Sequence, residues 1–285
     1  MVNDHLKTIP QYILPKHLLT SFAGLLADVK HKRIKNRLIK RFIRTYDIDM
    51  TEALEENPEH YPSFNDFFIR RLKPECRPIA DADIISPVDG FVSEIGRIEK
   101  GQIFQAKGRH YDVNQLLNCS PEMSAPFENG HFATLYLSPK DYHRVHMPID
   151  ATLKEMIFVP GKLFSVQPTT ARVIPHLFAR NERLVVFFDT QLGPMAMVLV
   201  GATIVGGIAT SWHGDIVRSR KSARFIYPAS QYSETDLTKA EEMGYFKLGS
   251  TVVLLFGNDC PVEWRHDLES GTRIKLGEPL ASLTR

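Results

Sequence analysis

Short apolar runs, rich in β-branched and aromatic residues, dominate the sequence after about residue 84. Gly, Pro, Asn or Asp separates each run from the next, which is typical of strands joined by turns. The strands predicted in this way are Phe91–Ile98, Phe132–Leu137, Thr152–Val159, Leu184–Asp189, Met195–Val200, Thr203–Ala209 and Thr251–Phe256. With helical periodicity nearer the N-terminus, the pattern predicts an α+β protein: amphipathic helices followed by a largely antiparallel, barrel-sandwich-like β body.

The longest stretch without a charged residue is Thr190–Gly214, and its 25 residues would be enough to cross a bilayer as a helix. Pro194 and several glycines interrupt it, so two buried strands are a better interpretation than a membrane span. Further along, Gln231–Met243 is polar. We expect it to be a surface linker or a short helix before a C-terminal segment that begins with a strand.

The first 50 residues carry a net charge of +6, whereas the other 235 carry −4. Apolar residues recur at helical spacing from Leu18 to Val29 and continue in phase to Ile43, and eight Lys and Arg lie within residues 30–44. One or two amphipathic helices with a cationic face fit this pattern, and such helices commonly bind anionic bilayers. A helix packed on its own domain and a nucleic-acid contact are the alternatives, of which the apolar face disfavours the second.

The three cysteines, Cys76, Cys119 and Cys260, are odd in number and widely spaced. They predict neither a disulfide framework nor a zinc site, and a reducing compartment is the default. The N-terminus has no signal-peptide pattern, because Pro10 and Pro15 interrupt it. The sequence also lacks a phosphate loop, a dinucleotide fingerprint, a zinc-protease helix and a nucleophile elbow.

Three segments carry residues that could perform chemistry. His143 and His146 can both titrate near neutral pH, which suits a general acid and base, although surface polar residues would look the same. Asp89 precedes a glycine and could either form a turn or orient a histidine. Ser250 and Thr251 follow a glycine and lead into an apolar strand, which by itself predicts only the start of a strand.

Taken together, these segments closely resemble the bacterial type of phosphatidylserine decarboxylase proenzyme. The resemblance covers nearly the whole chain after about residue 60, and the family's self-cleavage motif is Leu248-Gly249-Ser250-Thr251. The similar segments are Phe67–Pro74, Ser86–Gly90, Tyr142–Pro148, Pro160–Val166, Phe178–Arg183, Val200–Gly206 and Gly244–Val252.

The resemblance implies that Ser250 Oγ attacks the carbonyl of Gly249, with His146 as the base and Asp89 orienting it. The resulting ester eliminates to a dehydroalanine, which loses ammonia and leaves a pyruvoyl group derived from Ser250. This pyruvoyl cofactor forms a Schiff base with phosphatidylserine and acts as the electron sink while carbon dioxide leaves, giving phosphatidylethanolamine. His143 is expected to contact the substrate or to help deliver a proton in decarboxylation. Neither pyridoxal phosphate nor a metal is expected.

The same resemblance divides the chain into a membrane-association region over residues 1–60, a catalytic body over 61–249, and an α chain over 250–285 that completes the catalytic body. The two cleavage products would form a heterodimer, and a homodimer of that unit remains open. The expected location is peripheral, on the cytoplasmic face of the cell membrane, in contact with anionic lipid and without nucleic acid.

Three other interpretations compete with this one. Ser250, His146 and Asp89 could form the triad of a serine hydrolase, although no nucleophile elbow is present. A pyruvoyl decarboxylase for a soluble amino acid would not need the basic amphipathic arm. A non-enzymatic membrane-binding β module would leave the chain uncut and the histidines without a role.

Overall fold

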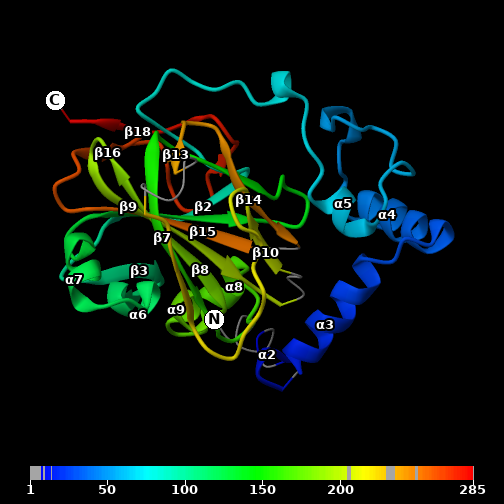
Figure 1. Ribbon diagram of the computed structural model, residues 1–285, viewed down its shortest axis with the longest axis horizontal. Coiled ribbons are helices and arrows are strands. Elements are labelled where there is room, and N and C mark those ends of the chain that lie inside the picture. The colour runs from blue at the N-terminus through cyan, green and yellow to red at the C-terminus, as the bar shows by residue number, and fades with distance from the viewer. Residues whose placement is uncertain are drawn as a thin grey trace.

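The computed structural model describes residue 8 and residues 10–13, 15–203, 207–228, 235–247 and 250–284. Its centre is a nine-stranded sheet in which every neighbouring pair of strands is antiparallel. Figure 1 shows this sheet at the centre of the β body, with the N-terminal helices projecting to one side. The strands in spatial order are β12 (Ala223–Ile226), β7 (Ala151–Val159), β8 (Arg183–Thr190), β9 (Gly193–Gly201), β15 (Ser250–Phe256), β5 (His131–Leu137), β2 (Gly90–Arg97) and β17 (Arg273–Ile274), while β13 (Asp236–Leu237) also pairs with β7.

Three smaller sheets and several short helices complete the β body. The first contains, in spatial order, β11 (Gly214–Asp215), β10 (Gly207–Thr210), β14 (Glu242–Lys247) and β6 (Arg144–His146). The second contains β1 (Ile84–Ile85), β18 (Pro279–Leu283) and β16 (Val262–Trp264). The third pairs β3 (Gln102–Ala106) with β4 (Arg109–Asp112). The short helices are α6 (Val113–Leu117), α7 (Pro121–Ser124), α8 (Pro168–Ala171) and α9 (Leu177–Arg180), with single 3₁₀ turns at Met50–Glu52, Pro74–Cys76 and Ala125–Phe127. The prediction of an α+β protein with sandwich-like, largely antiparallel sheets is therefore confirmed.

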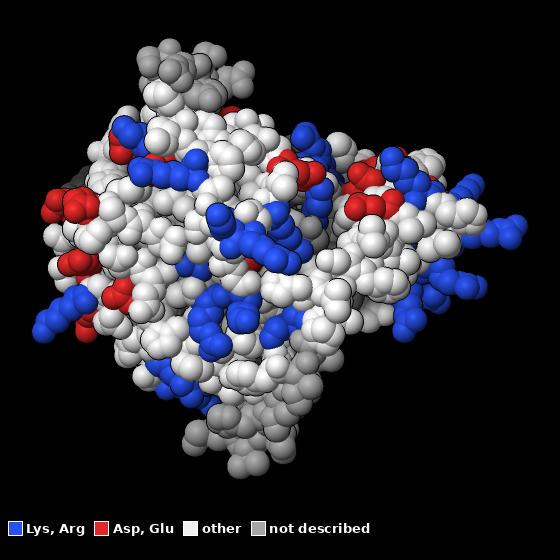
Figure 2. Space-filling model, turned by 60° about the horizontal axis from the view of Figure 1, so that its bottom comes forward, with Lys and Arg blue, Asp and Glu red and all other residues white. Residues whose placement is uncertain are grey.

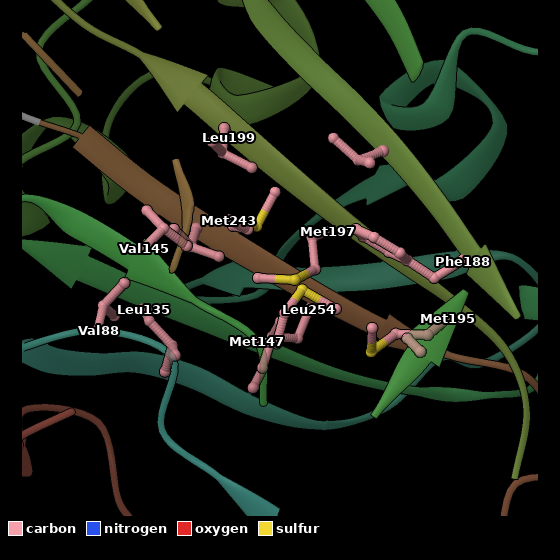
Figure 3. Packing of buried hydrophobic residues seen from close by; sticks show 14 of the residues in the cluster. Val88, Leu135, Val145, Met147, Phe188, Met195, Met197, Leu199, Met243 and Leu254 are labelled. Carbon is pink, nitrogen blue, oxygen red and sulfur yellow. The ribbon is translucent and has the colours of Figure 1, made fainter. Parts of the chain in front are cut away.

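Both faces of the central sheet are buried. Along β9, Met195, Met197 and Leu199 point into one hydrophobic cluster, whereas the alternate residues Ala196, Val198 and Val200 point into another. Figure 3 shows the first cluster, in which the β9 side chains and Leu254 of β15 meet Val145, Met147 and Met243 from the layer that covers them. Because successive side chains of a strand point to opposite faces, a sheet covered on both sides needs continuous apolar runs.

This double burial also explains the long uncharged stretch. Residues 190–214 form the end of β8, all of β9 and β10, and the turns between them, apart from the undescribed residues 204–206. In the described part of the chain, no helix is long and apolar enough to span a membrane. Six of the predicted strands agree closely with observed strands. The seventh, Thr203–Ala209, is described only in part and continues as β10 to Thr210.

The expectation of a linker or short helix at Gln231–Met243 is wrong for the residues that the structure describes. Asp236–Leu237 forms β13 against β7, and Glu242–Lys247 forms β14 between β10 and β6. Leu237 and Met243 are both buried in the core. β14 lies between two partner strands, so the polar composition of this stretch does not indicate its place in the sheets. Residues 231–234 lie outside the described chain.

The N-terminal helices are α2 (Pro10–Ile13), α3 (Lys16–Ala27), α4 (Lys32–Tyr46) and α5 (Phe64–Phe68). The apolar side of α4 packs on α5, where Ile39 and Phe42 meet Phe64, Phe67 and Phe68 in a third hydrophobic cluster. The opposite side of α4 presents most of its Lys and Arg to solvent. Figure 2 shows these cations gathered on the projecting part of the molecule. The apolar side of α4 is therefore covered within the chain.

Helix α3 is different, because a stripe of its large apolar side chains faces solvent. Leu18, Phe22 and Leu25 are 71%, 69% and 74% exposed, and their spacing of three and four residues places them on one side of the helix. Exposing three large apolar side chains on one side of a helix is unfavourable in water, so this stripe is a candidate contact surface.

Candidate active site

Ser250 is the first residue of β15, at the centre of the large sheet, where it lies opposite Leu137 of β5 and Gly201 of β9. Its side chain is fully buried, and its Oγ has no hydrogen-bond partner among the described residues. A buried hydroxyl without a partner is unfavourable, so such groups point to a functional site. The preceding residues of the predicted cleavage motif, Leu248 and Gly249, lie outside the described chain.

Ser250 lines a cavity of about 600 Å³ between the β body and the N-terminal helices. Leu26 of α3 and Phe42 of α4 contribute to one side of it, and Tyr136 and Leu137 of β5 lie on the other. Most of the remaining lining is also apolar or uncharged. An apolar cavity of this size with one unpaired hydroxyl suits a ligand that is mainly hydrocarbon.

His143 lies in the segment that joins β5 to β6, and its ring is fully buried. Its Nδ1–H donates to the carbonyl of Asp141 at 2.8 Å, so Nε2 carries the free lone pair. No described residue donates to that Nε2. Phe68, which also lines the cavity, has its ring centroid 4.2 Å from that of His143. Burial lowers the pKa of His143 to about 3, so the ring is neutral at pH 7.

His146 is the last residue of β6. Its Nδ1–H donates to the carbonyl of Ala240 at 2.8 Å, and the Tyr142 hydroxyl lies 3.3 Å from its Nε2. Burial lowers the pKa of His146 below its usual value, and the hydrogen bond to Ala240 acts in the opposite direction. The imidazole is therefore neutral at pH 7, which is the state that a general base requires.

Asp89 lies just before β2 and is only 2% exposed. Both of its carboxylate oxygens accept hydrogen bonds from the guanidinium of Arg77, and Oδ1 also accepts the backbone N–H of Leu276 at 2.9 Å. The structure thus places Asp89 in a buried ion pair rather than on a histidine.

The predicted relay of Asp89, His146 and Ser250 is not connected by hydrogen bonds among the described residues. Asp89 pairs with Arg77, His146 pairs with Ala240 and Tyr142, and Ser250 Oγ has no partner. The roles of these three residues and of His143 therefore stay predictions. Two features of the site were not expected from the sequence. One is Arg77, whose burial beside Asp89 depends on tertiary contacts. The other is the group of aromatic side chains from α4 and α5 that line one side of the cavity.

Comparisons with known proteins identify the family of this chain. The family model described as phosphatidylserine decarboxylase matches residues 64–282, and a second model described as PSD matches residues 6–47. A phosphatidylserine decarboxylase proenzyme of Legionella pneumophila (strain Lens) is 60% identical, with 100% of each chain covered. A proenzyme of the same name from Polaromonas naphthalenivorans is 50% identical, over 99% of this chain and 98% of the relative.

A third proenzyme of that name, from Bordetella pertussis, is also 50% identical, over 98% of this chain and 94% of its own length. The chain belongs to the phosphatidylserine decarboxylase family.

Proposed function

We propose that this protein decarboxylates phosphatidylserine to phosphatidylethanolamine, using a pyruvoyl group that self-cleavage between Gly249 and Ser250 creates. The observation that supports it best is the buried, unpaired hydroxyl of Ser250 on an apolar cavity, in a chain of this family. The serine is the residue that would become the cofactor, and its hydroxyl is free to react. Membership of an enzyme family disfavours the non-enzymatic module, and the relatives' names disfavour the serine hydrolase.

In the proposed cleavage, Ser250 Oγ attacks the carbonyl carbon of Gly249 and His146 takes the hydroxyl proton. The amide bond becomes an ester, and the proton passes to the freed amine. Elimination then releases Gly249 as a carboxylate and leaves a dehydroalanine, whose imine tautomer is hydrolysed by water to the pyruvoyl group and ammonia. Both reacting groups belong to one backbone, so proximity supplies much of the rate. Both chains stay in one fold, because β15 of the second chain lies between β5 and β9 of the first.

The pyruvoyl group supplies an electron sink for the pair of electrons that carbon dioxide leaves behind. The residues of the chain would bind the lipid and move protons. His143 fits the role of contacting the substrate or helping to deliver a proton in decarboxylation, because its Nε2 has no partner among the described residues and its ring lies beside Phe68 of the cavity.

The lipid would reach the cavity from the bilayer. We propose that the exposed stripe of α3, formed by Leu18, Phe22 and Leu25, inserts at the headgroup boundary while the cations of α4 face anionic lipid. Because other residues of α3 line the cavity itself, this docking would place the cavity beside the bilayer surface.

The arm can be tested without removing the helices that pack on the body. Replacing Leu18, Phe22 and Leu25 together by Gln should lower the partition constant to phosphatidylglycerol vesicles about 100-fold, at about 1 kcal/mol for each partly inserted side chain. Vesicle sedimentation measures this constant. Leu54→Gln, an exposed leucine elsewhere, is the matched control and should bind like the wild type. Equal binding of the triple variant and the wild type would contradict the proposed insertion.

The substrate can be tested by comparing lipid with its soluble parts. Release of carbon dioxide should be rapid with phosphatidylserine in mixed micelles, and should fall about 100-fold or more in kcat/KM with glycerophosphoserine, which lacks the acyl chains that fill an apolar cavity. Free serine should not react measurably. Comparable turnover of free serine would favour the soluble amino-acid decarboxylase and contradict the proposed substrate.

A further inference from the structure

Arg77 is the side chain that holds the carboxylate of Asp89. Its Nε lies 2.9 Å from Oδ1 and 3.1 Å from Oδ2, and its Nη2 donates to Oδ2 as well. Arg77 is 8% exposed, so the pair is shielded from solvent on both sides. A bidentate guanidinium fixes the plane of a carboxylate, and the backbone N–H of Leu276 fixes it from another direction.

Arg77 is itself held in place by its neighbours. Its Nη2 donates to Glu52 at 2.8 Å, and its Nη1 donates to the carbonyl of Cys76 at 2.6 Å. Burial would lower the pKa of Arg77, but the hydrogen bonds to Asp89 and Glu52 outweigh it and raise that pKa. Arg77 therefore remains charged at every pH at which the protein is folded.

Asp89 and Tyr142 line one cavity, and the Tyr142 hydroxyl lies 3.3 Å from Nε2 of His146. Burial lowers the pKa of His143 and of His146, and in each case the negative charge of Asp89 acts in the opposite direction by favouring the protonated ring. A base that takes a proton from a serine becomes an imidazolium, which a nearby carboxylate stabilises. Asp89 can act in this way only while it is ionised, and a buried carboxylate without a cation favours its protonated form.

We propose that Arg77 is a positioning residue for self-cleavage, holding Asp89 ionised and in one orientation so that its charge stabilises the imidazolium formed on His146. The inference rests on the proposed function, because it assumes that Ser250 is activated within this chain.

The other charged groups around Asp89 do not substitute for Arg77. Eight other charged residues and one tyrosine line the cavity beside Asp89. They are Asp47, Asp49, Glu52, Arg70, Lys140, Asp141, Tyr142, Arg273 and Lys275. Arg273 pairs with Asp141 at 3.0 Å, and Lys275 lies 3.7 Å from Glu52. The guanidinium of Arg70 donates to the carbonyl of Lys140 at 3.4 Å. Within the described chain, Asp89 forms an ion pair with Arg77 alone.

The test follows cleavage of the full-length chain as a function of pH. Four proteins are synthesised in a cell-free system: the wild type, Arg77→Gln, Arg77→Lys and Arg224→Gln. Translation is then stopped, and samples are exchanged into buffers from pH 6 to 9.5. Intact mass gives the fraction cut over time. Arg224→Gln is the matched control, since it also removes an arginine from an ion pair, with Glu155 at the far edge of the large sheet.

Arg77→Gln should cleave about tenfold more slowly than wild type at pH 7 and recover most of the difference by pH 9, because higher pH ionises the unpaired Asp89. Arg77→Lys should lie between them, since it keeps the charge without the bidentate contact. Arg224→Gln should match wild type. A purely structural role for Arg77 predicts the same loss at every pH, and that outcome would overturn the proposal, as would a wild-type rate in Arg77→Gln.

Two further outcomes keep the result decisive. If circular dichroism shows that Arg77→Gln does not fold, Arg77→Lys decides: slower cleavage at an unchanged melting temperature supports the proposal, and an unchanged rate overturns it. If the wild type itself stays uncut, the proposed function fails rather than this inference about Arg77.

Discussion

Ser250→Ala should give a single uncut chain without decarboxylase activity. The substitution removes the oxygen that acts as the nucleophile and that must leave Cβ in the elimination, so we expect a fall in cleavage rate of roughly 10⁴-fold or more. The β body should stay folded, because an unpaired buried hydroxyl is replaced by a smaller apolar group. Intact mass of the denatured protein, followed by a turnover assay with phosphatidylserine, measures both effects.

Ser282→Ala is the control for this experiment. Ser282 is exposed on β18 and belongs to the same predicted cleavage product, so its loss should change only the mass of the smaller fragment. In the wild type and in this control, that fragment should begin at residue 250 and be lighter than simple hydrolysis predicts, because the terminal amine has been lost. A Ser250→Ala chain that is still cut between residues 249 and 250 would rule out the proposed chemistry.

The two histidines should separate the two reactions. His146→Ala should slow self-cleavage by about 10²–10⁴-fold, the usual contribution of a general base. His143→Ala should leave cleavage largely intact and reduce turnover of phosphatidylserine, because its free Nε2 lies beside Phe68 of the cavity. The readouts are the fraction cut and the kcat of the purified, cut enzyme. The opposite pattern would exchange the two roles.

The pH dependence of wild-type cleavage follows from the buried base. His146 acts while neutral, and burial lowers its pKa below the ordinary histidine value of 6.5. The rate should therefore be constant at neutral and higher pH and should fall only as the pH drops below that value, where the ring becomes protonated. A rate that already falls between pH 8 and pH 7 would show that another group is the base.

Local patterns in the sequence were sufficient for most of the β body. Met195–Val200 and Thr251–Phe256 are continuous apolar runs because their strands are covered on both faces, and each lies within an observed strand. The pattern failed for Gln231–Met243, whose described part forms strands in two different sheets. Strand pairing there depends on partners about 85 to 100 residues away along the chain, and no local signal carries that information.

The N-terminal helices show the same division. The alternation of cations and apolar residues predicted amphipathic helices from Leu18 to Arg44, and α3 and α4 lie there. Whether an apolar side is buried depends on a segment elsewhere in the chain. Helix α5 covers the apolar side of α4, whereas the apolar stripe of α3 is exposed. Periodicity along a helix shows that an apolar face exists, but packing decides what covers it.

The sequence by itself determined the chemical groups of the site, through the Leu-Gly-Ser-Thr motif, the histidine pair and Asp89. Only the tertiary structure decided their surroundings. The Ser250 hydroxyl has no described hydrogen-bond partner and lies on a cavity that residues of α3 and α4 also line. The Asp89 carboxylate accepts hydrogen bonds from Arg77 and from the backbone of Leu276. Residue type and spacing are local properties of a chain. Burial, charge pairing and the shape of a cavity arise between segments as far apart as residues 26 and 250, and they exist only once the chain has folded.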